Sequence, residues 1–205
     1  MKDCFRWIYV RKWPVLNTKI GWTLFNLVFI SFYQNFLLLS LAVPALVVAA
    51  VDNTNDVNNI DLLASATFLA LVVIETVADN QQEDFQNTKY SLIDMKKILY
   101  PFSIGFINWG LFSISRHPNY LAEQLLWLVF YMFSVAATGS GINITLLGPL
   151  LLILLFQGST ALSESITGGK YAQYQNYRSL VPRFIGNFWS LKTSYHAVII
   201  ENKNN

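Results

Sequence analysis

The chain has 205 residues, of which 54% are apolar and 13% are charged, and its mean hydropathy is +0.39. Soluble domains carry nearer a quarter charged residues, so this composition argues against a soluble globular enzyme and against a disordered tail. A net charge of +2 is too small to indicate a nucleic-acid-binding surface. One cysteine, Cys4, and two histidines exclude an internal disulfide and argue against a metal site.

Four stretches are apolar over the roughly 20 residues that a helix needs to cross a bilayer. They cover residues 20–51, 61–78, 120–137 and 142–160. Pro44 is expected to kink or end the first helix, and the turn at 138–141 predicts that the last two helices form an antiparallel hairpin. Segment 92–114 is broken by proline and glycine, so we expect it to be interfacial or re-entrant. The predicted fold is an all-α membrane helix bundle, with one domain over 1–190 and a polar tail over 191–205.

The basic residues predict an orientation for these helices. Five Lys and Arg residues precede the first span, four lie between the second and third, and five follow the fourth. All 14 therefore lie on one side of a four-span arrangement, whereas the opposite loops carry Asp52 and Asp56 and no base. The positive-inside rule then predicts that both termini face the cytoplasm. The protein is expected to be a multi-pass membrane protein, of the endoplasmic reticulum in a eukaryote or the inner membrane in a bacterium.

Polar residues interrupt the cytoplasmic end of the second span. Glu75, Asp79, Gln82 and Gln86 follow helical spacing and predict one narrow polar stripe. A carboxylate at membrane depth costs about 3 kcal/mol, so it usually faces a cavity or a partner. The alternative is a stripe that emerges into lipid headgroups and water.

The third span begins with a second polar group. Pro118 suits the first turn of a helix, because its missing N–H would be unpaired there in any case. The free N–H groups of that turn favour an anion, and Arg116 lies beside them, so the pattern predicts a phosphate site. Asn119 and Glu123 follow on one face. Arg116 could instead pair with lipid headgroups, and Glu123 with another helix.

Two further groups of polar residues follow helical spacing or lie within a span. Tyr171, Tyr174 and Arg178 recur at i, i+3 and i+7 after the fourth span, which is typical of an interfacial tyrosine belt or of a cap over a nucleotide. Tyr33 and Gln34 lie in the middle of the first span, where they either bond to a neighbouring helix or line a pocket. The groups at the ends of the second, third and fourth spans share one side, which predicts a common site for a large polar ligand.

The run GLFSISRHPNYLAE at 110–123 resembles the C-terminal signature of the steroid 5-alpha-reductase family, and is most similar to its bacterial-type membrane proteins of unassigned substrate. The pattern Glu75-(x)3-Asp79-x-Gln81, the stretch 29–34 and the pattern over 170–182 fit the same family in the same order. The match covers most of the chain from Asp3 to Pro182. Known members carry further N-terminal helices.

The resemblance implies an NADPH-dependent reductase of a carbon–carbon double bond conjugated to a ketone in a lipid-like, apolar substrate. It implies that six residues hold the dinucleotide: Asp79, Arg116, Asn119, Glu123, Tyr174 and Arg178. Tyr33 and Glu75 are our candidate catalytic residues. Glu75 stands where the steroid reductases use an amide, and Tyr33 is our candidate for the donor that polarises the carbonyl. The steroid enzymes also have a different run where this chain has Arg116-His117-Pro118.

Two other functions are compatible with the sequence. Membrane methyltransferases that use S-adenosylmethionine share the run Arg116-His117-Pro118-x-Tyr120, but they usually have a glycine soon after it, where this chain has Leu121-Ala122-Glu123. A truncated, non-catalytic relative is the third interpretation. The sequence does not indicate the oligomeric state.

Overall fold

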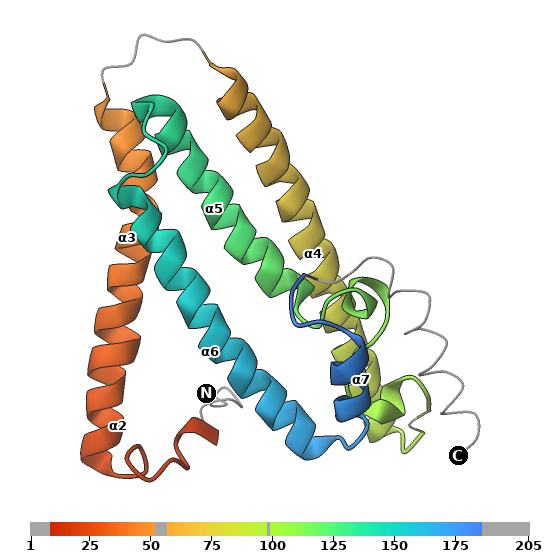
Figure 1. The fold of residues 1–205 in the computed structure, drawn as a ribbon. Helices are drawn as coiled ribbons and strands as arrows, with labels where there is room; N and C mark the ends of the chain where they lie inside the picture. Colours follow the sequence, from red (N-terminus) through yellow and green to blue (C-terminus); the bar gives the residue numbers. More distant parts are fainter. Residues whose placement is uncertain (1–8, 52–56, 98, 186–205) are drawn as a thin grey trace. The chain divides into compact units, whose positions relative to one another are not determined.

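A computed structural model describes residues 9–51, 57–97 and 99–185 (Figure 1). In this part of the chain the regular secondary structure is helical, and four helices are long and apolar enough to cross a membrane. They are Lys19–Ala50, Asn59–Asp94, Pro118–Thr138 and Ile144–Lys170. The predicted all-α class with four spanning helices is therefore confirmed. Cys4, Asp52, Asp56 and the tail 191–205 lie outside the described residues.

The chain divides into two compact units. Unit 1 consists of Met1–Ala64 and Trp127–Ser159, and unit 2 consists of Ser65–Leu126 and Thr160–Asn205. Helices α4 (Asn59–Asp94), α5 (Pro118–Thr138) and α6 (Leu147–Lys170) contribute to both units. Each unit has its own packing.

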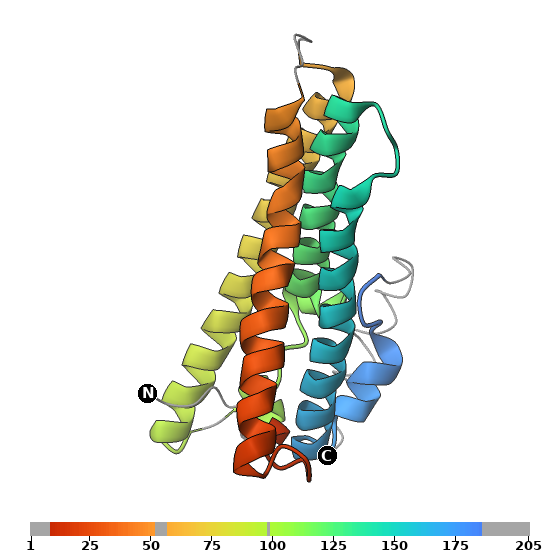
Figure 2. The same ribbon diagram turned by 90° about the vertical axis from the view of Figure 1, so that its left-hand side faces the viewer.

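The first spanning helix belongs to unit 1 and is built from three segments. Helix α2 (Lys19–Phe25) begins at Thr18, whose hydroxyl accepts a hydrogen bond from the Gly21 N–H at 3.0 Å. A π-helical stretch (Asn26–Tyr33) follows and leads into α3 (Gln34–Ala50). Figure 2 shows the three as one continuous rod. Pro44 is buried inside α3 and does not end it, because a membrane helix can re-satisfy its backbone through a neighbour.

The hairpin predicted between the last two spans is present in unit 1. Helix α5 ends at Thr138, and a 3₁₀ turn (Ile144–Leu146) leads into α6. Ser134 and Thr145 join the two arms through hydroxyl groups 2.6 Å apart. Against α6, Leu37 and Leu41 of α3 pack with Leu152 in a buried cluster.

Unit 2 contains most of α4, which is longer than predicted. Asn58 caps this helix by accepting from the N–H groups of Ile60 and Asp61, and Asp61 accepts from the Asn58 N–H in return. The predicted span ended at Ala78, but the helix continues to Asp94 because no glycine or proline interrupts that stretch. The stripe from Glu75 to Gln86 therefore lies on one helix, as predicted.

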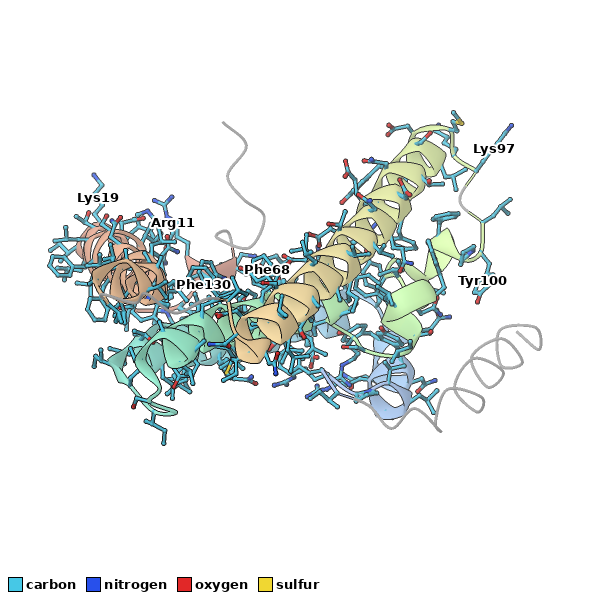
Figure 3. The ribbon with its side chains drawn as sticks, turned by 90° about the horizontal axis from the view of Figure 1, so that it is seen from above. Arg11, Lys19, Phe68, Lys97, Tyr100 and Phe130 are labelled. Carbon is cyan, nitrogen blue, oxygen red and sulfur yellow. The ribbon has the colours of Figure 1, made fainter. Side chains whose placement is uncertain are left out.

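The segment after α4 contains two 3₁₀ turns, Phe102–Ile104 and Gly110–Ser113. Before these turns, Lys97 and Tyr100 extend their side chains away from the ribbon (Figure 3). Helix α5 then begins at Pro118, as predicted. Helix α6 continues past the predicted end at Thr160 to Lys170, and a short helix, α7 (Tyr174–Leu180), follows. The expectation that segment 92–114 is interfacial or re-entrant stays a prediction.

Candidate functional site

The polar centre of unit 2 is one buried carboxylate on α6, that of Glu164. Its side chain is 2% exposed and lies within 4 Å of four basic side chains. Three of these partners are arginines, which form ion pairs with it, and the fourth is His117. The basic partners come from the start of α5, from α7 and from the segment after α7. Glu164 therefore holds together chain segments that are far apart in sequence.

Arg116 is the most deeply buried of these partners. Its Nε donates to Glu164 Oε1 at 2.9 Å, and its side chain is 7% exposed. One Nη donates to the carbonyl oxygens of Arg178 and Val181 at 2.7 and 2.6 Å. Backbone bonds reinforce this contact, because the Arg116 N–H donates to Pro182 O at 2.9 Å. The predicted phosphate ligand is therefore also the residue that fastens the C-terminal segment to the start of α5.

His117 lies on the other side of the same carboxylate. Its Nε2 is 3.2 Å from Glu164 Oε1, and its ring stacks on Tyr120 at a centroid distance of 5.3 Å. Burial lowers the pKa of His117 to about 4, although the nearby Glu164 carboxylate opposes this shift. The imidazole is therefore neutral near pH 7, and it donates its Nε2–H to Glu164.

The two remaining arginines form the accessible edge of the cluster. Arg178 Nε lies 3.6 Å from Glu164 Oε2, and its side chain is 48% exposed. Arg183 lies 3.4 Å from the same oxygen and is 33% exposed. Three guanidinium groups thus surround one carboxylate while His117 is neutral. The cluster has an excess of positive charge, and two of its arginines reach solvent.

A second polar group lies on α4 and α5. Asn119 donates its side-chain N–H to Asp79 Oδ1 at 2.9 Å. One helical turn away from this pair, before Asp79 on α4 and after Asn119 on α5, the carboxyl groups of Glu75 and Glu123 lie close enough to hydrogen-bond. The structure therefore brings together four of the acidic and amide residues that the sequence singled out on these two helices: Glu75, Asp79, Asn119 and Glu123.

Gln81 connects this part of α4 to the signature segment. Its side-chain oxygen accepts from the Leu111 N–H at 2.9 Å, and Gly110 lies directly against the same side chain. Gly110 has a φ of +62°, and a Cβ at this position would overlap Gln81. Gln81 therefore positions the loop that precedes Arg116.

Tyr174 belongs to a buried hydrophobic cluster of unit 2. It is 5% exposed and packs edge-on against Phe106, with ring centroids 5.1 Å apart. Burial raises the pKa of Tyr174 to about 12, so its hydroxyl stays protonated. Tyr171 follows the end of α6 and lies outside α7, so the predicted single face through Tyr171, Tyr174 and Arg178 is wrong. The break at 171–173 separates the first tyrosine from the other two residues.

Tyr33 belongs to unit 1 and is described there by its own contacts. It ends a row of stacked aromatic rings that includes Phe25 and Phe29. The ring centroids of Phe29 and Tyr33 are 5.3 Å apart. Its hydroxyl donates to the Leu151 carbonyl at 3.1 Å. The sequence left two alternatives for this mid-span tyrosine, a bond to a neighbouring helix or a place in the lining of a pocket. The structure shows the bond to a neighbouring helix. Its catalytic role, like the roles of the other site residues, stays a prediction.

Sequence reasoning missed Glu164, His117 and Arg183 as members of the cluster. Glu164 could have been found, since it is an acidic residue within an apolar helix, where an unpaired carboxylate is costly. Arg183 carried no signal, because its role depends on how the chain folds back after α7.

Comparisons with known proteins place these residues in a family. The family described as "Protein of unknown function (DUF1295)" matches residues 5–183. This family is related to steroid 5-alpha-reductase-like proteins. The uncharacterized protein C594.04c of Schizosaccharomyces pombe is 35% identical in an alignment that is 205 residues long. The alignment covers 91% of this chain and 57% of that protein. The chain thus spans little more than half the length of this curated relative. No solved structure matches the chain.

Proposed function

The chain belongs to the DUF1295 family, and we propose that it is a membrane oxidoreductase that uses NADPH to reduce a conjugated carbon–carbon double bond in a lipid-like substrate. The finding that carries this proposal is the excess of positive charge around Glu164. The chain spans 57% of the curated relative, so the proposal concerns what this part of such a protein binds and does.

The arginine cluster suits the phosphate groups of a dinucleotide. Arg178 and Arg183 are partly exposed, and each is held at one end by Glu164. Guanidinium groups fixed in this way bind phosphate oxygens through short, charge-assisted hydrogen bonds. Arg116 is committed to Glu164 and to backbone carbonyls, so its part is to position the other two arginines as well as to add positive charge.

The polar groups of α4 and α5 suit the remaining parts of the same ligand. The Asp79–Asn119 pair offers an acceptor and an amide, which match ribose hydroxyls and a carboxamide. Glu75 and Glu123 lie one turn away from that pair on the same two helices, within hydrogen-bonding reach of each other. The Tyr174 hydroxyl is neutral near pH 7, so in this proposal it is a hydrogen-bond donor to the dinucleotide.

When bound, the reduced nicotinamide supplies the hydride for such a reaction. The protein must orient the ligand, exclude water and supply a proton donor for the substrate. Glu75 is the donor that we propose in unit 2, because its carboxyl group lies one turn from the Asp79–Asn119 pair. Tyr33 is the donor that we propose in unit 1, where its hydroxyl already donates to Leu151. Apolar helices of membrane-spanning length suit a substrate that reaches the site from lipid.

Nucleotide binding to the detergent-purified full chain tests this proposal. A ligand that binds the folded state raises the unfolding midpoint, so NADPH is compared with S-adenosylmethionine. We expect stabilisation by NADPH and none by S-adenosylmethionine. Arg178→Gln should weaken NADPH binding about tenfold or more, the loss expected for one charge-assisted hydrogen bond.

Lys97→Gln is the matched control for this experiment. It removes one positive charge from the same unit, at an exposed side chain that extends away from the ribbon (Figure 3). Its NADPH affinity should equal that of the wild type. Stabilisation by S-adenosylmethionine alone would point to a methyltransferase. The absence of any shift would favour a non-catalytic relative.

A further inference from the structure

Lys89 is a buried cation that the proposed dinucleotide contacts do not use. It lies on α4 in unit 2 and is 6% exposed. Its Nζ donates to the Gly105 carbonyl at 3.2 Å and lies over the rings of Phe85 and Tyr90, at 5.7 and 5.0 Å from their centroids. No ion pair joins Lys89 to a carboxylate of the described residues. Buried ammonium groups are usually paired, because their desolvation is costly.

A second cation lies near this one. Lys170 is exposed, ends α6 and directly precedes Tyr171 in the chain. The two segments meet where the Tyr171 ring packs directly against Gly105, the residue whose carbonyl accepts from Lys89. Gly105 has a φ of +86°, so any larger residue there would be strained and would also displace Tyr171. The fold thus gathers like charges at this place.

Tyr171 adds a phenol hydroxyl to this part of unit 2. Burial and the neighbouring Tyr90 raise the pKa of Tyr171 above its usual value. It therefore keeps its proton near pH 7 and can donate a hydrogen bond. Two ammonium groups and a phenol form a set rich in donors. The group that complements such a set is a compact anion with several acceptor oxygens.

We propose that Lys89, Lys170 and Tyr171 form a binding site for a phosphate monoester that is separate from the Glu164 cluster. A phosphate monoester carries nearly two negative charges at pH 7 and three acceptor oxygens, so it offsets both ammonium groups. Two sources have this chemistry: the 2′-phosphate that distinguishes NADPH from NADH, and the headgroup of phosphatidate. The first source rests on the proposed function, whereas the second does not.

The experiment measures unfolding midpoints of the detergent-purified full chain in two arms. One arm titrates NADPH against NADH, and the other compares micelles containing phosphatidate with micelles containing phosphatidylcholine. We expect the wild type to prefer the phosphate-bearing ligand in at least one arm by about tenfold, as one charge-assisted contact provides. Lys89→Met keeps the buried stem and removes the charge, and it should abolish that preference. Lys170→Met should reduce it, and Lys97→Met should not change it.

The outcomes separate this inference from the proposed function. A preference for NADPH that Lys89→Met removes, while NADH still binds, identifies the 2′-phosphate and shows that the variant is folded. A preference for phosphatidate that Lys89→Met removes, with no nucleotide binding, supports the site and overturns the proposed function. If the wild type shows no preference in either arm, or if Lys89→Met and Lys170→Met both keep it, the site does not exist. In that case equal binding of NADPH and NADH would leave the proposed function intact.

Discussion

At the scale of single residues, Glu164 illustrates why a buried charge is kept in a membrane protein. Its carboxylate is 2% exposed, which is costly, and Arg116, Arg178 and Arg183 repay that cost only while they stay in place. Removing one partner from such a buried pair typically costs about 3 to 5 kcal/mol, because the other charge is left without compensation. The same arrangement leaves positive charge in excess. It can therefore both fasten the C-terminal segment and attract an anion.

His117 makes the stability of this cluster depend on pH. Burial lowers the pKa of His117 to about 4, below the usual value of 6.5. Between these values the unfolded chain binds a proton that the folded chain does not bind. The stability due to neutral His117 is therefore fully present above pH 6.5 and is lost as the pH falls towards 4, by up to about 3 kcal/mol. Unfolding in detergent, followed from pH 7.5 to 4.5, should show this decline.

His117→Gln tests the assignment, because its amide can still donate to Glu164 but does not titrate. We expect its stability to fall less steeply with acid than that of the wild type. His196→Gln removes the only other histidine and separates loss of His117 from loss of a histidine in general. Parallel pH curves for His117→Gln and the wild type would show that His117 does not control the decline.

Among the site residues, the sequence predicted proximity better than it predicted partners. Helical spacing was enough to align Glu75 with Asp79 and Asn119 with Glu123, because each pair lies on one helix. The bond from Asn119 to Asp79 joins two helices and follows from the fold alone. The partners of Arg116 also lie outside any local pattern. They are Glu164 on α6 and carbonyls that approach only because the chain turns back after α7.

At the scale of helices, the contact between α3 and α6 in unit 1 depends on one glycine. A Cβ on Gly148 would lie 2.6 Å from the Ser40 carbonyl oxygen and 2.8 Å from the Leu41 nitrogen. Pro44 has no N–H to bond to Ser40 four residues before it, so this carbonyl is free of its usual helical partner. Small residues at such places let membrane helices approach closely. The proline and the glycine thus belong to one packing arrangement.

Gly148→Ala should therefore force these two helices apart. We expect a loss of about 1 to 3 kcal/mol in the free energy of unfolding, as for other overpacked contacts. Gly158→Ala is the control on the same helix, because nothing lies within 4 Å of its Cβ position. It should be neutral or slightly stabilising, since alanine favours a helix by about 1 kcal/mol over glycine. Unfolding in detergent measures both variants, and equal effects would argue against the close approach.

Helix starts were easier to predict from the sequence than helix lengths. Pro118 predicted the start of α5, because proline suits the first turn of a helix. Hydropathy located the second and fourth spans but ended them too early, at 78 and 160. A helix does not stop where its side chains become polar, and α4 and α6 continue to Asp94 and Lys170. The π-helical stretch that ends at Tyr33 had no recognisable sequence signal.

At the scale of the whole molecule, the longer helices bear on how the chain lies in a membrane. Lys89 was expected between the second and third spans but lies within α4, and Lys170 ends α6. Both lysines still lie toward the end of their helix that the charge pattern assigns to the cytoplasm. A long helix can continue beyond the hydrocarbon into the headgroup region, and lysines there keep their charge near water or phosphate. The extended ends are therefore compatible with the predicted orientation.

That orientation leads to a prediction about access from the outside of intact cells. Both termini and the segment after α4 should face the cytoplasm, and the turn between α5 and α6 should face the other side. In a chain with Cys4→Ser, a cysteine at Ser140 should react with a membrane-impermeant maleimide in intact cells if the protein lies in the plasma membrane. In the endoplasmic reticulum it should react only after the lumen is opened. A cysteine at Lys96 should react from the cytoplasmic side alone.

Both positions are exposed, so a difference between them reports the side of the membrane. Labelling of Lys96→Cys from the far side, with Ser140→Cys protected, would invert the topology and place the Glu164 cluster away from cytoplasmic NADPH.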